Sequence, residues 1–146
     1  MRTERPERSR GQASDAVQPL DAQPPAMAIL VVDDDPGMRS LLQDFLAEEG
    51  YSVDTARDGS EALTRLSSRM PGLVLLDLNM PRMDGIELFA HLRARELGVP
   101  VVFMSAGDRP QRVAERYGAA DWLAKPFTLE ALLTVVRRQT GTAPGR

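Results

Sequence analysis

Short apolar runs alternate with segments of helical periodicity along most of the chain. Five runs have the length and composition of strands, and they span residues 28–32, 51–55, 73–76, 99–104 and 121–123. The segments 29–32, 73–76 and 101–104 are apolar at every position, which is typical of parallel strands covered on both faces. The pattern therefore predicts a parallel sheet with helices on both sides.

The intervening segments carry apolar residues at the spacing of amphipathic helices. The first such set is Met38, Leu41, Leu42, Phe45 and Leu46, and the last is Leu129, Leu132, Leu133 and Val136. Gly50, Gly98 and Gly118 stand where helices are expected to end. Five β–α repeats of this kind predict an α/β fold with a doubly wound, five-stranded parallel sheet.

The chain ends differ from this pattern. Residues 1–26 mix Arg, Glu, Ser, Gln and Pro without periodicity, so we expect a disordered tail, with a solvated spacer favoured over a basic docking segment. Residues 27–139 form the predicted domain, and residues 140–146 are expected to be a disordered end.

Composition narrows the class of protein. The chain has 146 residues, a formal net charge of -3 and no cysteine. It therefore lacks the excess positive charge that a protein needs to bind the phosphate backbone of nucleic acids. Without cysteine it can form no disulfide or thiolate metal site. No segment is long and apolar enough to span a bilayer, so a cytoplasmic protein without direct nucleic-acid or membrane contact is expected.

Polar side chains follow four of the apolar runs. Asp33 and Asp34 follow the first, Asp77 ends the third, Ser105 follows the fourth and Lys125 follows the fifth. Because the carboxyl ends of parallel strands share one edge, these side chains are expected to converge. Three carboxylates at this distance repel one another unless a divalent cation neutralises them, so the sequence predicts a Mg²⁺ (or Mn²⁺) site. The same repulsion predicts that Asp33→Asn would stabilise the metal-free fold, because it removes one of the charges.

The same set of groups favours phosphoryl transfer. Asp77 beside a metal can attack phosphorus and become an aspartyl phosphate. Lys125, the one lysine among 18 basic residues, and the Ser105 hydroxyl would stabilise the developing charge. Asp35 precedes Pro36 and is interpreted as a helix N-cap instead of a ligand.

Five short motifs stand at the ends of the predicted strands: ILVVDDDP at 29–36, LLDLNMP at 75–81, MDG at 83–85, the Ser105-Ala106 pair, and KPF at 125–127. With these motifs the chain resembles the receiver domain of two-component response regulators, which implies a flavodoxin-like sheet with strand order 2-1-3-4-5. The resemblance covers about residues 27–139. The chain departs from the family pattern between Ser105 and Trp122, where the sequence is a residue or two shorter than usual. Pro110 stands early in the brief helix predicted there, which ends near Gly118.

The resemblance implies a role for each matching residue. Asp77 would be the phospho-acceptor, and the metal ligands would be Asp34 directly, Asp33 through water, Asp77, and Asn79 through its backbone carbonyl. Ser105 and Trp122 would be the switch residues and Lys125 the phosphoryl-binding cation, with the Lys125-Pro126 bond cis. The donor would be a histidine kinase or a histidine phosphotransfer protein, and the signal would pass to a downstream protein, with a phosphorylation-dependent homodimer as a further possibility.

The sequence favours one function over two others. A stand-alone receiver that is not an enzyme in its own right is favoured, because few residues follow the last helical segment. A magnesium-dependent phosphohydrolase is disfavoured, because Asn79 occupies the place where such enzymes carry a second acid. No G-x-G-x-x-G follows the first strand, which argues against dinucleotide binding. His91, on the third helical segment, is expected to be a surface or packing residue.

Overall fold

The computed structural model describes residues 27–80, 85–95, 98–107 and 109–141. The predicted tail over 1–26 and most of the predicted C-terminal end therefore lie outside the described residues. The elements in chain order are β1 (Ala28–Val32), α1 (Pro36–Glu48), β2 (Ser52–Ala56), α2 (Gly59–Ser68), β3 (Leu73–Asp77), α3 (Gly85–Ala94), β4 (Val101–Ser105), α4 (Pro110–Tyr117), β5 (Asp121–Ala124) and α5 (Leu129–Thr140).

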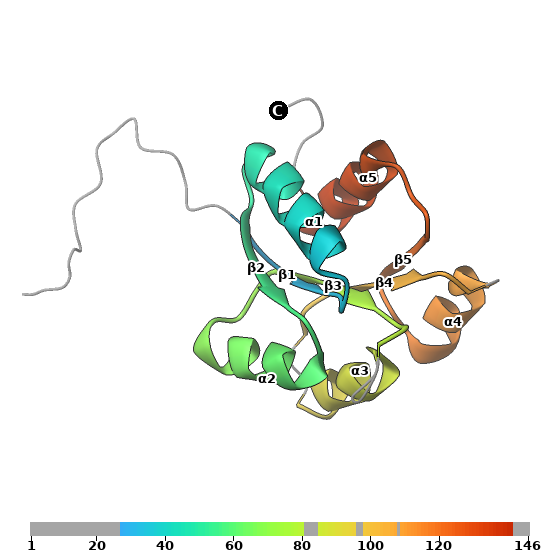
Figure 1. Cartoon of the computed structure of the whole chain (residues 1–146). Helices are drawn as coiled ribbons and strands as arrows, with labels where there is room; N and C mark the ends of the chain where they lie inside the picture. The colour runs from blue at the N-terminus through green and yellow to red at the C-terminus, as the bar shows by residue number, and fades with distance from the viewer. Residues whose placement is uncertain (1–26, 81–84, 96–97, 108, 142–146) are drawn as a thin grey trace, which may run out of the picture.

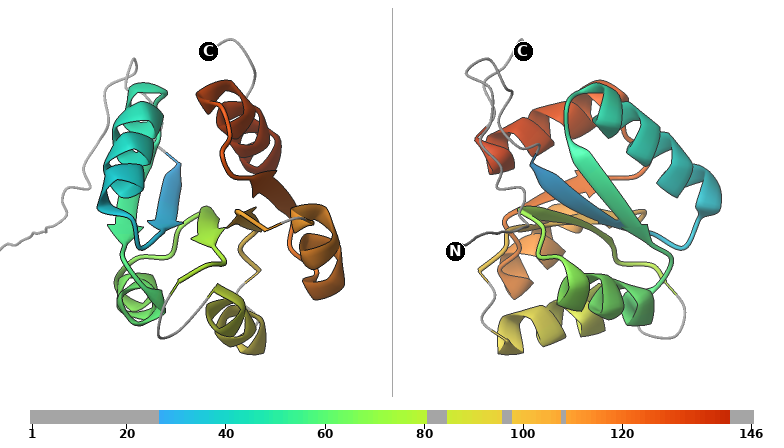
Figure 2. Two further views of the ribbon diagram at one scale, coloured as in Figure 1. Left: turned by 45° about the vertical axis from the view of Figure 1, so that its right-hand side comes forward. Right: turned by 90° about the vertical axis from the view of Figure 1, so that its left-hand side faces the viewer.

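The five strands form one parallel sheet in the order β2-β1-β3-β4-β5. Helices α1 and α5 cover one face of this sheet, and α2, α3 and α4 cover the other (Figure 1 and Figure 2). The predicted doubly wound α/β fold, its strand order and its two helical layers are confirmed. Among the described residues, no helix is long and apolar enough to cross a membrane.

The all-apolar strands are explained by two separate cores. In β1, Ile29 and Val31 pack in the cluster that contains residues of α1 and α5, whereas Leu30 and Val32 pack in the cluster that contains residues of α2 and α3. Successive side chains of a strand point to opposite faces, so a strand covered on both sides has no position for a polar group. The polar side chains therefore stand where the strands end.

Four of the five strands differ from their predicted bounds by one or two residues, and only β1 matches them. Strands β2, β3, β4 and β5 each end one residue later than predicted, and β2 and β4 also begin later. Strand β2 begins at Ser52 because the Tyr51 amide donates to the Leu46 carbonyl and so belongs to the turn that ends α1. Strand β4 begins after Pro100, which has no amide hydrogen to donate to a neighbouring strand. Helix α5 includes Thr140, so it extends one residue into the segment that was expected to be disordered.

Local signals set the helices that frame the sheet edge. The Asp35 side chain accepts a hydrogen bond from the Gly37 amide and caps α1, which confirms its interpretation as an N-cap. Helix α4 begins at Pro110 and ends at Tyr117, and it is capped by Gly118, whose φ of 80° is the left-handed conformation that glycine adopts without strain. The expected brief fourth helix is thus confirmed.

Candidate acidic site at the carboxyl edge of the sheet

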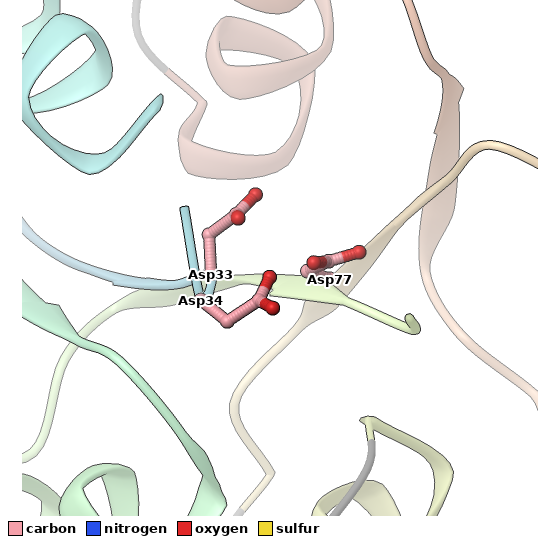
Figure 3. A group of neighbouring side chains, drawn as sticks. All are labelled: Asp33, Asp34 and Asp77. Atoms are coloured by element: carbon pink, nitrogen blue, oxygen red, sulfur yellow. The ribbon is translucent and has the colours of Figure 1, made fainter. Parts of the chain in front are cut away.

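Three carboxylates meet at one edge of the sheet. Asp33 and Asp34 follow β1, and Asp77 is the last residue of the adjacent strand β3 (Figure 3). Each offers an oxygen atom, and these three atoms lie within 4.8 Å of one another. Asp33 and Asp77 are 0% and 2% exposed, whereas Asp34 is exposed. The site is therefore a buried acidic pair with a third carboxylate at its open side.

The buried Asp33 is held on several sides. Its Oδ1 atom accepts a hydrogen bond from the Asp35 amide at 2.9 Å, and its Oδ2 atom accepts one from Lys125 Nζ at 2.8 Å. Its backbone carbonyl accepts a hydrogen bond from the Arg39 guanidinium at 2.8 Å. Sequence analysis did not identify Arg39. The one signal was a cation near the N-terminus of α1, where the helix dipole disfavours positive charge.

Lys125 reaches the carboxylates from the strand at the sheet's edge. The Lys125 amide donates to the Ser105 carbonyl at 2.8 Å, which fixes the residue at the end of β5 next to β4. Its ammonium lies 2.8 Å from Asp33 Oδ2 and 3.5 Å from Asp77 Oδ1. Burial alone lowers the pKa of Lys125, but the hydrogen bond and charge of Asp33 together with the charge of Asp77 outweigh it, so the pKa is raised. The Lys125-Pro126 bond is cis, as the resemblance implied.

Asp77 is held in an environment that opposes its ionisation. Burial raises its pKa above the ordinary value of 3.8, and the charges of Asp33 and Asp34 raise it further. The Asn79 amide, which donates to Asp77 Oδ1 at 3.1 Å, and the Lys125 charge lower the pKa but do not cancel the increase. A divalent cation would relieve this repulsion, so the donor set fits a hard metal ion that prefers oxygen ligands.

Two loops beyond β3 and β4 close the site. The Leu78 amide donates to the Met104 carbonyl at 3.0 Å, and the Asn79 side-chain oxygen accepts a hydrogen bond from the Ala106 amide at 3.2 Å. Ser105 is buried at the end of β4, and its hydroxyl oxygen accepts a hydrogen bond from the Gly107 amide at 3.0 Å. Asn79 therefore lies just beyond the end of β3, and Ser105 lies at the end of the neighbouring strand β4.

Gly85 allows the first residue of α3 to lie close to the end of β3. A Cβ atom on Gly85 would lie 2.5 Å from the Asp77 carbonyl oxygen and 2.8 Å from Leu78 Cα, so only glycine fits without movement of the backbone. This glycine ends the MDG motif, whose Met83 and Asp84 lie outside the described residues. The requirement for glycine here follows from the close approach of α3 to β3.

The remaining candidate residues lie away from the carboxylates. Trp122 is half-buried on β5 and packs against the core that includes α4, and it lines grooves beside both α4 and α5. His91 is exposed on α3, in agreement with its expected surface position.

A sequence profile described as the response regulator receiver domain matches residues 29–137. Among curated proteins, response regulator MprA from Mycobacterium avium (strain 104) is 44% identical over 116 residues, covering 76% of this chain and 50% of the relative. MprA from Mycolicibacterium vanbaalenii is 45% identical over 114 residues, covering 75% of this chain and 48% of the relative. The chain thus spans about half the length of the curated relatives it matches.

Solved structures give the same result. The receiver domain of NtrX from Brucella abortus matches with a TM-score of 0.73 and 35% identity, covering 79% of this chain and 99% of that one. TrrA from Thermotoga maritima, solved in complex with Mg²⁺ and BeF, matches with a TM-score of 0.71 and 34% identity, covering 77% and 98%. The chain belongs to the response regulator receiver domains of two-component systems.

Proposed function

We propose that Asp77 accepts a phosphoryl group from a phosphohistidine of a histidine kinase or a histidine phosphotransfer protein. The observation that carries this proposal is the surroundings of Asp77, which is 2% exposed and has two carboxylates within 4.8 Å and an ammonium 3.5 Å from its Oδ1 atom. A carboxylate so placed has neighbouring acidic groups that can bind a metal ion and an ammonium that can stabilise charge on a phosphoryl group, and both aid nucleophilic attack on phosphorus.

The transfer balances without a further reactant. A carboxylate oxygen of Asp77 forms a bond to phosphorus, and the bond from phosphorus to the imidazole nitrogen of the donor histidine breaks. The electron pair of that bond stays on the nitrogen, which takes up a proton. The products are an aspartyl phosphate on this chain and a free histidine on the donor, so the receiver is consumed stoichiometrically and acts as a signalling protein.

The proposed metal is Mg²⁺, with Mn²⁺ as a substitute. Asp33, Asp34, Asp77 and the backbone carbonyl of Asn79 would hold it. When bound, the ion neutralises the acidic group and polarises phosphoryl oxygens. Support for this assignment comes from the carboxylate oxygens of Asp33, Asp34 and Asp77, which lie within 4.8 Å of one another, and from the Mg²⁺–BeF complex of the similar protein TrrA.

Lys125 and Ser105 are the proposed groups that respond to the new charge. The Lys125 ammonium, now closer to Asp33, would turn to a phosphoryl oxygen. The Ser105 hydroxyl, which now accepts a hydrogen bond from Gly107, would donate its proton to another oxygen. A rotation of the Ser105 side chain toward the phosphoryl group would move the oxygen that holds the Gly107 amide, so phosphorylation would alter the loop after β4.

Trp122 is the proposed reporter of that change toward partners. It lines a groove of about 570 Å³ with the start of α4 and a groove of about 560 Å³ with α5. A movement of the indole therefore changes the shape of the surface on both sides of β5. A downstream protein or a second copy of the chain would recognise the new surface.

The scope of the protein beyond the receiver domain stays a prediction. The expectation of a stand-alone receiver without direct nucleic-acid contact was based on the sequence, and the matched curated relatives are about twice as long as the part they share with this chain. The phosphohydrolase alternative has no support in the site, because the Asn79 carboxamide cannot supply a proton as a carboxylic acid would.

Intact-mass measurement tests the proposal. The protein is incubated with a small-molecule phosphodonor and Mg²⁺, with EDTA in a parallel sample, and the Asp77→Asn variant is treated in the same way. We expect a phosphate mass increment that requires Mg²⁺ and that Asp77→Asn abolishes. Retention of the increment in Asp77→Asn would contradict the assignment.

A further inference from the structure

Asn79 connects the proposed acceptor to the loop that contains the proposed switch residue. Its amide donates to Asp77 Oδ1 at 3.1 Å, and its side-chain oxygen accepts a hydrogen bond from the Ala106 amide at 3.2 Å. One residue thus contacts both the acidic group after β3 and the first residue after β4.

Side-chain oxygens hold the amides of the first two residues after β4. The Ala106 amide is bound by Asn79 Oδ1, and the next amide, that of Gly107, is bound by Ser105 Oγ. The Ser105 backbone does not take part in this arrangement, because its carbonyl accepts a hydrogen bond from the Lys125 amide within the sheet. The strand end is therefore fixed by the sheet, while the turn beyond it depends on Asn79 and Ser105.

We infer that the Asn79 carboxamide is a positioning residue that holds the Ala106 amide in the unphosphorylated protein and so opposes switching. The inference rests on the proposed function. A phosphoryl group on Asp77 brings charged oxygens to the same rim, and charged acceptors form stronger hydrogen bonds than a neutral carboxamide. The Ala106 amide can turn to such an oxygen only after it leaves Asn79, so the existing bond raises the free energy of the switched state relative to the resting state.

The side chain of Asn79 can be tested apart from its backbone. Asn79→Ala keeps the amide that donates to Asp77 and the carbonyl proposed for the metal, and it removes only the acceptor for Ala106. Asn79→Asp keeps an acceptor oxygen and serves as the conservative variant. Ser105→Ala is the matched control for the neighbouring bond, because it removes the acceptor for Gly107 and leaves that for Ala106.

The first measurement uses metal-free, unphosphorylated, ¹⁵N-labelled protein. The chemical shifts and temperature coefficients of the amide protons of Ala106 and Gly107 are compared among the variants. We expect Asn79→Ala to give the Ala106 amide the values of a solvent-bonded group without altering Gly107, Ser105→Ala to do the reverse, and Asn79→Asp to keep Ala106 bonded. An Ala106 amide that is unchanged in Asn79→Ala would overturn the inference.

The second measurement is a titration with beryllium fluoride, a phosphoryl mimic, at saturating Mg²⁺. Asn79→Ala lacks the hydrogen bond to the Ala106 amide that opposes the switch in the wild type. The variant should therefore bind the mimic about fivefold more tightly than the wild type. Equal or weaker binding would overturn the inference, even with a released Ala106 amide. A wild type that binds no mimic would instead count against the proposed function, which keeps the two failures distinct.

Discussion

Lys125 lies closer to Asp33 than to Asp77. Its Nζ atom is 2.8 Å from Asp33 Oδ2 and 3.5 Å from Asp77 Oδ1. In the metal-free protein the ammonium therefore mainly neutralises the carboxylate that is not the proposed acceptor. Asp77 remains in a buried acidic environment with a raised pKa, which is a suitable state for a residue that is to gain a cation and a phosphoryl group.

Asp33→Asn is predicted to destabilise the metal-free protein. Crowding of like charges alone predicts stabilisation, but the structure favours the opposite sign because Asp33 is fully buried and is the nearer partner of Lys125. We expect a loss of about 1–2 kcal/mol, less than for a fully buried ion pair, since the ammonium can still pair with Asp77. Urea unfolding in EDTA measures the change. Asp34→Asn is the control, because it removes an exposed charge and should cost almost nothing.

Asp77→Asn is predicted to stabilise the metal-free protein at neutral pH. The pKa of Asp77 is raised in the folded state, so its ionisation opposes folding above that pKa and has no effect well below the ordinary value of 3.8. The variant should therefore unfold at a higher urea concentration than the wild type at pH 7, and this gain in stability should fade as the pH falls toward 4. Unfolding curves in EDTA across this range decide the matter, and a gain that grows on acidification would contradict it.

The fold could be predicted from the sequence because its strands are covered on both faces. Segments such as 73–76 have no polar position, and this pattern together with helical spacing fixed the order of elements. The predicted bounds of β2 and β4 were less accurate. Tyr51 is apolar and buried but forms the turn after α1, and a count of hydrophobic residues does not distinguish a buried turn from a buried strand.

The convergence of Lys125 with the three carboxylates was also predictable, since the carboxyl ends of parallel strands share one edge. The pairing within the site was not. That Lys125 prefers Asp33, that Arg39 binds the Asp33 carbonyl and that Asn79 binds Ala106 depend on side-chain conformations and on loops distant in sequence. The two carboxylates following one strand look equivalent in the sequence, but only Asp33 is buried and paired.

Lys125→Gln is predicted to strengthen Mg²⁺ binding while it weakens the metal-free fold. The ammonium lies within 3.5 Å of oxygens on both buried carboxylates, so it competes with the cation for the same negative charge. We expect Mg²⁺ to bind about threefold to tenfold more tightly, as measured by titration calorimetry. Arg137→Gln is the control, because it removes an ion pair with Glu49 between α5 and α1 and should leave Mg²⁺ affinity unchanged. Weaker binding in Lys125→Gln would show that the lysine supports the metal site.

Gly85→Ala is predicted to damage both the fold and the metal site. The added methyl group would lie 2.5 Å from the Asp77 carbonyl oxygen, and the groups it meets are mainly backbone, which cannot move aside as a flexible side chain can. Either α3 shifts away from β3 or the end of β3 moves. We expect a loss of about 2 kcal/mol or more in urea unfolding, because overpacking against backbone is among the costly substitutions.

Gly37→Ala separates this steric effect from a general effect of replacing glycine in a first helical turn. A Cβ atom on Gly37 would be 3.4 Å from Asp35 Oδ1, an ordinary contact, so the free energy of unfolding should change by less than about 0.5 kcal/mol. Movement at the end of β3 also displaces Asp77 from Asp33 and Asp34. Gly85→Ala should therefore bind Mg²⁺ more weakly even at temperatures where it is fully folded. If the folded variant bound Mg²⁺ with wild-type affinity, the methyl group would be accommodated by a shift of α3 alone.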